Sequence, residues 1–238
     1  MSNKNLNLPP FGKEGDVQPA AINRRKFLTY LGVAGSTAAI ISACSKDDDN
    51  DGNTAPPGSI DLGKDDIGIL NYAYALEQLE AAFYTQVIAS PFSGITANET
   101  ALLTDIRDHE VAHREFFKAA LGTKAITSLE VNFAAINFGS RDSVLATAKA
   151  FEDLGVSAYN GAGKLLVKPD YLVLAGKIVS VEARHAALIR DLISNGTFAD
   201  SSAVDANGLD MAKSPNDVLG LAKTYLKSVL WAGNLPTS

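Results

Sequence analysis

A short pattern of residues occurs twice in the chain, and this repetition constrains the fold more than any other feature of the sequence. Each copy is Glu-x-x-His, first at Glu110 and His113 and again at Glu182 and His185. Two of the three histidines of the chain are used in this way. Because residues three apart lie on one face of an α-helix, each copy places a carboxylate beside an imidazole. The pair of copies predicts a paired metal site.

A further Glu precedes each copy and has a Tyr seven residues after it. Glu77 and Tyr84 precede the first copy, and Glu152 and Tyr159 precede the second. The interval from the preceding Glu to the Glu of the copy is 33 residues in the first case (77 to 110) and 30 in the second (152 to 182). These similar intervals predict two helical hairpins of the same design.

Start and stop signals divide the middle of the chain into four helices. Thr96 and Glu99 form a capping box, which satisfies free backbone donors at a helix start. Pro91 ends the preceding helix, and Asp170 is the expected N-cap of the last one. We expect helices at about 65–89, 96–121, 140–168 and 170–195.

The links between these helices predict their topology. The first and third links are short, so each pair of helices should form an antiparallel hairpin. The link at about 122–139 is long enough to cross the bundle, and its apolar residues should pack on the outside of the helices. They are Leu129, Val131, Phe133, Ile136 and Phe138. A fifth helix is expected from Ser214-Pro215 to about Trp231, either capping the bundle or forming an interface.

The charged residues of the repeat fall within apolar stripes whose members are three and four residues apart, which is the spacing of a bundle interior. A carboxylate that faces a core is costly unless it is paired or bound to a metal. Four such carboxylates would repel one another or take up protons, whereas two divalent cations would neutralise them. The stripes are Leu70, Ala73, Glu77, Glu80, Tyr84, Val87; Leu103, Ile106, Glu110, His113, Phe117, Ala120; Leu145, Ala148, Glu152, Gly155, Tyr159, Ala162; and Ala175, Ile178, Glu182, His185, Ile189, Leu192.

One Glu from each of two helices and Glu-x-x-His from each of the other two resembles the di-iron or di-manganese carboxylate pattern of ferritin-like bundles. Residues 65–195 resemble that superfamily throughout, and residues 71–84 are similar to its exported bacterial branch, which is related to plant desiccation-associated proteins. The resemblance implies an all-α fold: a ferritin-like four-helix bundle with a long crossover between the second and third helices and an additional C-terminal helix.

The resemblance also implies roles for the residues of the repeat. One metal would be held by Glu77, Glu110 and His113, and the other by Glu152, Glu182 and His185. Glu110 and Glu182 would bridge the two metals. Tyr84 and Tyr159 would hydrogen bond to the ligands, although core packing is an alternative explanation. Glu80 has no counterpart, because Gly155 occupies the matching place; we expect it beside the ligands, with an extra ligand or a gate as alternatives.

The ligand types indicate which metals the site would take. Carboxylates and imidazoles without thiolates suit iron or manganese. Two iron ions would support oxidation of Fe(II) with oxygen or peroxide, two manganese ions would support disproportionation of peroxide, and the spacing does not separate them. A non-catalytic stress-protection or partner-binding module at the cell surface is an alternative function. The expected partners are metal ions and oxygen or peroxide.

A second motif overlaps the first copy of the repeat. His109, Glu110 and His113 form His-Glu-x-x-His, the zinc metalloprotease helix in which two His bind zinc and the Glu is a general base. This reading leaves the second copy of the repeat unused, and Val181 stands where that copy would need the matching His. We therefore expect His109 at the surface or rim of the site, or as a hydrogen-bond donor to a ligand.

The N-terminal quarter of the chain has the features of a targeting signal. Arg24 and Arg25 precede a mildly apolar run that ends in small residues before Cys44. Residues 1–44 therefore resemble a twin-arginine signal with a bacterial lipoprotein cleavage site. An uncleaved membrane helix is the alternative, but the run is diluted by polar residues. The expected protein is exported and anchored to the cell envelope by a lipid on Cys44, at the outer-membrane surface or elsewhere.

Composition separates a linker from a domain and excludes some partners. Residues 45–60 are acidic and polar, which predicts a disordered tether, either a plain spacer or a surface-export signal. Residues 61–238 should form the helical bundle domain. The net charge of -6 argues against nucleic acid as a partner, and a single cysteine excludes an intramolecular disulfide. The sequence does not indicate an oligomeric state.

Overall fold

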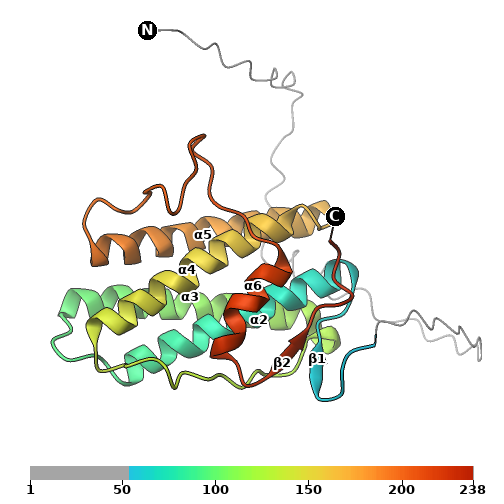
Figure 1. Cartoon of the computed structure of the whole chain (residues 1–238), viewed down its shortest axis with the longest axis horizontal. Coiled ribbons are helices and arrows are strands. Elements are labelled where there is room, and N and C mark those ends of the chain that lie inside the picture. Colours follow the sequence, from blue (N-terminus) through green and yellow to red (C-terminus); the bar gives the residue numbers. More distant parts are fainter. Residues whose placement is uncertain (1–53, 238) are drawn as a thin grey trace, which may run out of the picture. The chain divides into compact units, whose positions relative to one another are not determined.

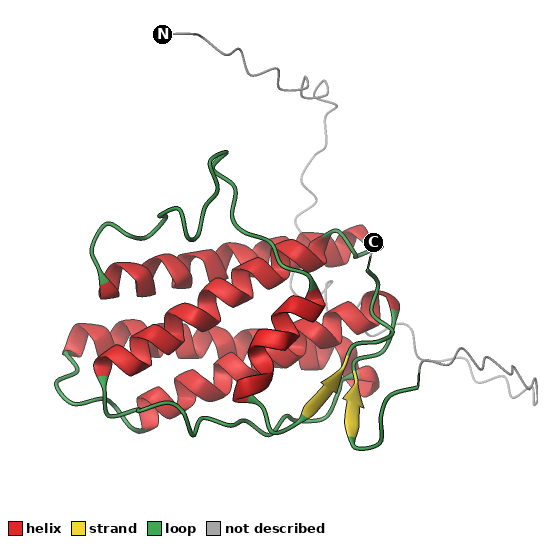
Figure 2. Cartoon of the chain, viewed as in Figure 1, coloured by secondary structure: helices red, strands yellow, loops and turns green. Residues whose placement is uncertain are grey.

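Four long helices make up most of the described chain, which comprises residues 54–237 of a computed structural model (Figure 1). They are α2 (Asp65–Ala89), α3 (Ala97–Leu121), α4 (Arg141–Gly163) and α5 (Pro169–Ile193). Helices α2 and α3 form one hairpin, α4 and α5 form the other, and α2 also packs against α4 (Figure 2). The expected all-α four-helix bundle is confirmed. The expected signal segment at 1–44, with Arg24, Arg25 and Cys44, lies outside the described residues.

The helix ends follow from the local sequence, but the expected end of α4 and the expected N-cap of α5 are wrong. At the start of α3, Thr96 Oγ1 accepts from Glu99 N at 3.1 Å and the Glu99 carboxylate accepts from Thr96 N at 2.9 Å, as a capping box requires. Helix α4 ends at Gly163 rather than just before Pro169. Helix α5 has Lys168 at its N-cap, so Asp170 lies in the first turn, because Pro169 is suited to the first helical position.

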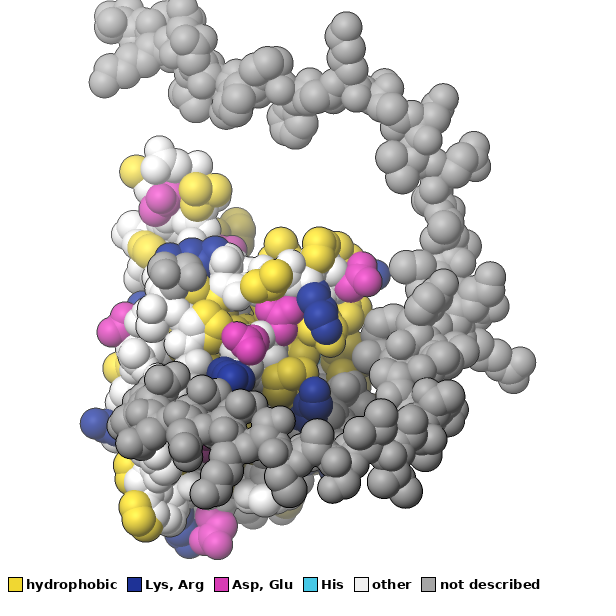
Figure 3. All heavy atoms as spheres, turned by 90° about the vertical axis from the view of Figure 1, so that its right-hand side faces the viewer, with side chains coloured by type: hydrophobic (Ala, Val, Ile, Leu, Met, Phe, Trp, Pro, Cys, Tyr) yellow, Lys and Arg dark blue, Asp and Glu magenta, His cyan; other side chains and the backbone are white. Residues whose placement is uncertain are grey.

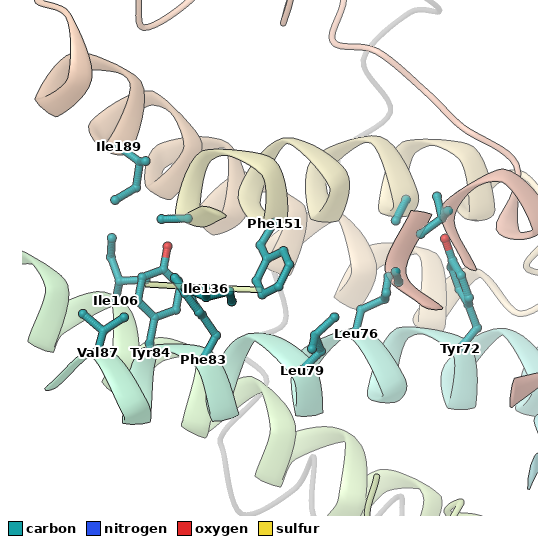
Figure 4. Packing of buried hydrophobic residues seen from close by; sticks show 14 of the residues in the cluster. Tyr72, Leu76, Leu79, Phe83, Tyr84, Val87, Ile106, Ile136, Phe151 and Ile189 are labelled. Atoms are coloured by element: carbon teal, nitrogen blue, oxygen red, sulfur yellow. The ribbon is translucent and has the colours of Figure 1, made fainter. Parts of the chain in front are cut away.

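The core is centred on an aromatic cluster around Phe83 of α2, which is fully buried. Its ring contacts Phe151 of α4 edge-on at 5.1 Å between centroids, and Phe133 and Phe138 of the crossover at 6.1 and 5.9 Å. Ile136, also from the crossover, belongs to the same cluster (Figure 4). The expected packing of the crossover against the helices is therefore confirmed for four of its five apolar side chains, whereas Leu129 is not part of the cluster.

The expected C-terminal helix is present and begins where expected, but it is shorter than the range expected to reach Trp231. Helix α6 covers only Pro215–Ala222; the 3-10 turn η2 (Lys223–Tyr225) and strand β2 (Val229–Trp231) follow. Strand β2 pairs in parallel with β1 (Ser59–Asp61), so Ser59 and Ile60 belong to a strand rather than to a tether. Helical periodicity is a local signal, whereas this pairing joins residues far apart in sequence. A second 3-10 turn, η1 (Gly122–Lys124), follows α3.

A long segment between α5 and α6 is attached to the bundle through Arg190, whose side chain is almost fully buried. Its Nε and Nη2 donate to the two carboxylate oxygens of Asp153 on α4, both at 2.7 Å. Its Nη1 donates to Asp200 at 3.2 Å and to Ser202 at 3.0 Å within the segment. One guanidinium therefore joins α4, α5 and the segment.

The outer surface carries charges of both signs. On the face shown in Figure 3, Lys and Arg side chains lie apart from one another among Asp, Glu and hydrophobic side chains. Within residues 54–237, none of the helices has the length and apolar character needed to cross a membrane.

Candidate metal centre

The six side chains of the repeat converge between the four helices. They form two groups whose potential ligand atoms lie within 4.8 Å of one another. All four Glu residues are fully buried, and the side chains of His185 and His113 are 5 % and 14 % exposed. The first group is Glu77, Glu110, His113 and Glu182, and the second is Glu110, Glu152, Glu182 and His185.

Glu110 and Glu182 belong to both groups, and their oxygens are divided between the two histidines. Oε1 of Glu110 lies 2.8 Å from His185 Nδ1, and its Oε2 lies 3.6 Å from His113 Nδ1. Oε1 of Glu182 lies 2.9 Å from His113 Nδ1, and its Oε2 lies 3.8 Å from His185 Nδ1. Each carboxylate therefore presents one oxygen to each half of the site, which is the arrangement that a bridging carboxylate needs.

Glu77 and Glu152 each use one oxygen within the site and the other for a tyrosine. Oε2 of Glu77 lies 3.4 Å from His113 Nδ1, and Oε2 of Glu152 lies 3.5 Å from His185 Nδ1. The remaining oxygen of Glu152 accepts a 2.5 Å hydrogen bond from Tyr84, and that of Glu77 accepts one from Tyr159. The tyrosines thus bond across the bundle to the Glu of the other hairpin, which spacing along one helix did not indicate.

The buried polar atoms that lack hydrogen-bond partners mark where a metal would fit. Among residues 54–237, eight of the ten such atoms belong to these six side chains. They are Oε2 of Glu77 and Glu152, both oxygens of Glu110 and Glu182, and Nδ1 of His113 and His185. Buried polar atoms are normally hydrogen bonded, so a set of unsatisfied oxygen and nitrogen atoms facing one another fits divalent cations.

The carboxylates of the site differ in how strongly they hold a proton. Burial raises the pKa of Glu152 to about 8, with the negative charges of Glu110 and Glu182 acting in the same direction. Burial also opposes ionisation of Glu110, but its close contacts with the imidazoles of His113 and His185 outweigh burial and lower the pKa of Glu110 to about 2. Although burial lowers the pKa of each histidine, the carboxylates outweigh it and raise both pKa values to about 12. Bound protons thus balance the charge that metal ions would balance.

Glu80 lies at the edge of the site, opposite Gly155. A Cβ at Gly155 would lie 3.1 Å from Oε1 of Glu80 and 3.7 Å from Oε2 of Glu182. The missing side chain of Gly155 therefore leaves the space that the Glu80 carboxylate occupies. Glu80 is buried, and burial with the surrounding carboxylate charges raises its pKa well above the ordinary value. Neither ligand group of the described chain includes it, consistent with a place beside the ligands.

His109 is exposed and does not converge with His113. Its Nδ1 instead lies 2.9 Å from Nε2 of His185 on α5. No ligand group in the described part of the chain includes His109, so the two histidines of His-Glu-x-x-His do not share one ion position as the protease motif requires. The sequence predicted a rim position or a hydrogen bond to a ligand for His109, but not which ligand it contacts.

Comparison with known proteins agrees with this geometry. Residues 65–195, more than half of the chain, match the family described as ferritin-like domain. No curated protein matches the sequence. The matched range begins with α2 and ends just after α5, so it contains all four helices that supply the buried carboxylates and histidines. The chain belongs to the ferritin-like domain family.

Proposed function

We propose that this protein binds two iron ions between its four helices and oxidises Fe(II), or consumes oxygen or peroxide, in protection against stress. The observation that carries this proposal is the set of eight unsatisfied ligand atoms in the buried cluster. Two manganese ions are the alternative cofactor, because carboxylate oxygens and imidazole nitrogens suit both metals. When bound, an Fe(II) pair would pass electrons to oxygen or peroxide, and a manganese pair would take electrons from one peroxide and return them to another.

The residues of the chain have distinct roles in this proposal. Glu77 and His113 would hold one metal, Glu152 and His185 the other, and Glu110 and Glu182 would bridge them. Tyr84 and Tyr159 fix the rotamers of Glu152 and Glu77 by hydrogen bonding the oxygens that do not face the site. The apolar core reaches these residues through Phe83, whose ring packs edge-on against that of Tyr84. The exposed edge of His113 is the side from which solutes would approach.

Metal analysis of the purified protein tests the proposal. After anaerobic loading with Fe(II), we expect about two iron ions per chain, and fewer in Glu110→Ala, because that change removes one bridging ligand. Glu115→Ala is the matched control, since Glu115 lies on the same helix but its side chain is 51 % exposed. Absence of bound metal in the wild type, or unchanged metal content and stability in Glu110→Ala, would contradict the proposal.

Activity assays then separate the two metals. Protein loaded with iron should oxidise added Fe(II) in the presence of oxygen or peroxide, and protein loaded with manganese should accelerate the decay of peroxide. If loaded protein does neither, a non-catalytic protective or partner-binding role on the same fold is supported instead.

We further propose that the protein is exported and anchored to the cell envelope through a lipid on Cys44. The support is the sequence of residues 1–44, with Arg24 and Arg25 before an apolar run. Labelled fatty acid should be incorporated into the wild type and not into Cys44→Ser. Replacing both arginines, with Arg24→Lys and Arg25→Lys, should block export. Equal labelling of Cys44→Ser would contradict the anchor.

A further inference from the structure

The imidazole rings of His109 and His185 lie end to end. Their planes are within 10° of each other, the centroids are 5.2 Å apart, and Nδ1 of His109 is 2.9 Å from Nε2 of His185. The centroid separation exceeds the nitrogen separation by about two ring radii, so both nitrogens lie on the line between the ring centres. This is the geometry of an N–H···N hydrogen bond. Two nitrogens that shared one metal ion would instead set their rings at an angle.

The opposite edge of His185 determines which ring donates when a metal is bound. Nδ1 of His185 faces the carboxylates, 2.8 Å from Glu110 and 3.5 Å from Glu152. A nitrogen that binds a metal uses its lone pair, so the proton of the neutral ring must then reside on Nε2. His185 therefore donates, and Nδ1 of His109 accepts. The exposed ring of His109 can keep its own proton on Nε2, toward water.

This contact breaks the symmetry of the two halves. His109 directly precedes Glu110, and at the same place before Glu182 the chain has Val181, whose side chain cannot accept a hydrogen bond. Among residues 54–237, no group hydrogen bonds to Nε2 of His113. The two halves thus have the same types of expected ligand. They differ in the hydrogen bond to Nε2 of the histidine, which, within the described part of the chain, His185 has and His113 lacks.

We propose that His109 is a positioning residue, which holds His185 in the tautomer and orientation that direct the Nδ1 lone pair to the metal. The metal position beside His185 is consequently the tighter of the two. This inference rests on the proposed metal centre. It adds that the two metal positions differ in affinity, which the sequence repeat does not indicate. Hydrogen-bond partners of this kind change metal affinity by about 10- to 100-fold.

Stepwise metal titration tests the inference. The stripped full-length protein is titrated with Zn²⁺, a diamagnetic probe, in competition with a chromophoric chelator. In His109→Ala the tighter step should weaken by about 10- to 100-fold while the weaker step is unchanged. His109→Asn should restore the tighter step, since its side-chain oxygen can accept near the place of Nδ1. Asp108→Ala, an exposed neighbour on the same helix, is the control and should match the wild type.

Nitrogen NMR of the Zn²⁺-loaded protein reads the tautomer directly. A slowly exchanging proton on Nε2 of His185 is expected in the wild type and in His109→Asn, and faster exchange in His109→Ala. Two Zn²⁺ ions bound with wild-type affinities in His109→Ala would overturn the inference and leave the metal centre intact. Equal weakening of both steps with a lower melting temperature would also overturn it. A wild type that binds no Zn²⁺ and no iron would overturn the proposed function, and the inference with it.

Discussion

Tyr84 of α2 donates a 2.5 Å hydrogen bond to Oε1 of Glu152 on α4, and so joins the two helical hairpins inside the candidate metal centre. Tyr159 of α4 returns the same contact to Glu77 of α2. Each tyrosine leaves the second oxygen of its carboxylate facing the histidines. The two contacts thereby connect the packing of the bundle to the direction in which its carboxylates point.

Removing either hydroxyl should weaken both stability and metal binding. Tyr84→Phe leaves Oε1 of Glu152 buried without a donor, which costs about 1–3 kcal/mol, and frees the carboxylate to rotate, which lowers metal affinity about 10-fold or more. Urea unfolding and metal titration measure the two effects. Tyr72→Phe is the control, because the Tyr72 hydroxyl is buried without a hydrogen-bond partner, and its loss should not destabilise. Equal behaviour of the two variants would refute the role of the contact.

The stability of the metal-free protein should fall as the pH rises from 5 to 8. The pKa of Glu152 is raised by burial from 4.5 to about 8, so the folded protein keeps a proton that the unfolded chain releases. Its contribution is present below pH 4.5 and is lost as the pH rises through 8. Raised pKa values of about 12 for His113 and His185, against 6.5, act in the same direction above pH 6.5.

Glu110 does not oppose this trend in the same window. Its lowered pKa of about 2 contributes stability that is present above pH 4.5 and is lost only toward pH 2. Urea unfolding with a chelator at several pH values measures the slope, and Glu152→Gln should make it shallower. Metal affinity should rise over the same range because metals displace these protons. A stability that increases from pH 5 to 8 in the metal-free wild type would contradict the assignment.

Gly155 and Glu80 should be energetically coupled. Gly155→Ala places a Cβ 3.1 Å from Oε1 of Glu80, so the carboxylate must move and the protein should be destabilised. In a Glu80→Ala background the same change should be neutral or stabilising, since Ala is favoured over Gly in a helix by about 1 kcal/mol. A double-mutant cycle of unfolding free energies measures the coupling. Additive effects would mean that the two residues do not share this space.

Arg190 should control how firmly the segment between α5 and α6 is held. Arg190→Met removes the hydrogen bonds to Asp153 and Asp200 and should cost about 1.5–3 kcal/mol, as for bonds to charged groups. Residues 194–214 should then be cut faster in limited proteolysis. Arg184→Met, at an exposed position of the same helix, should leave the cutting rate unchanged. Unchanged cutting in Arg190→Met would show that other contacts hold the segment.

The expected ligands could be found from the sequence because their signal is local. Glu110 and His113 lie three residues apart on one helix, and apolar neighbours at steps of three and four show that this face is buried. The capping box at Thr96 likewise depends only on adjacent residues. Four helices, their pairing in hairpins and a shared cluster follow from such local patterns and from the link lengths.

Contacts that join separate elements were decided only by the tertiary structure. The crossing of Tyr84 to Glu152, the bond of His109 to His185 and the pairing of β1 with β2 each join residues that local periodicity treats as independent. The C-terminal strand was expected as helix because its helical pattern carries no information about the distant Ser59–Asp61 segment. The sequence by itself determined which residues face the interior, since that depends on helical pitch. Only the packing of helix against helix decided which of these residues contact one another, because contacts between helices depend on how the helices lie relative to one another.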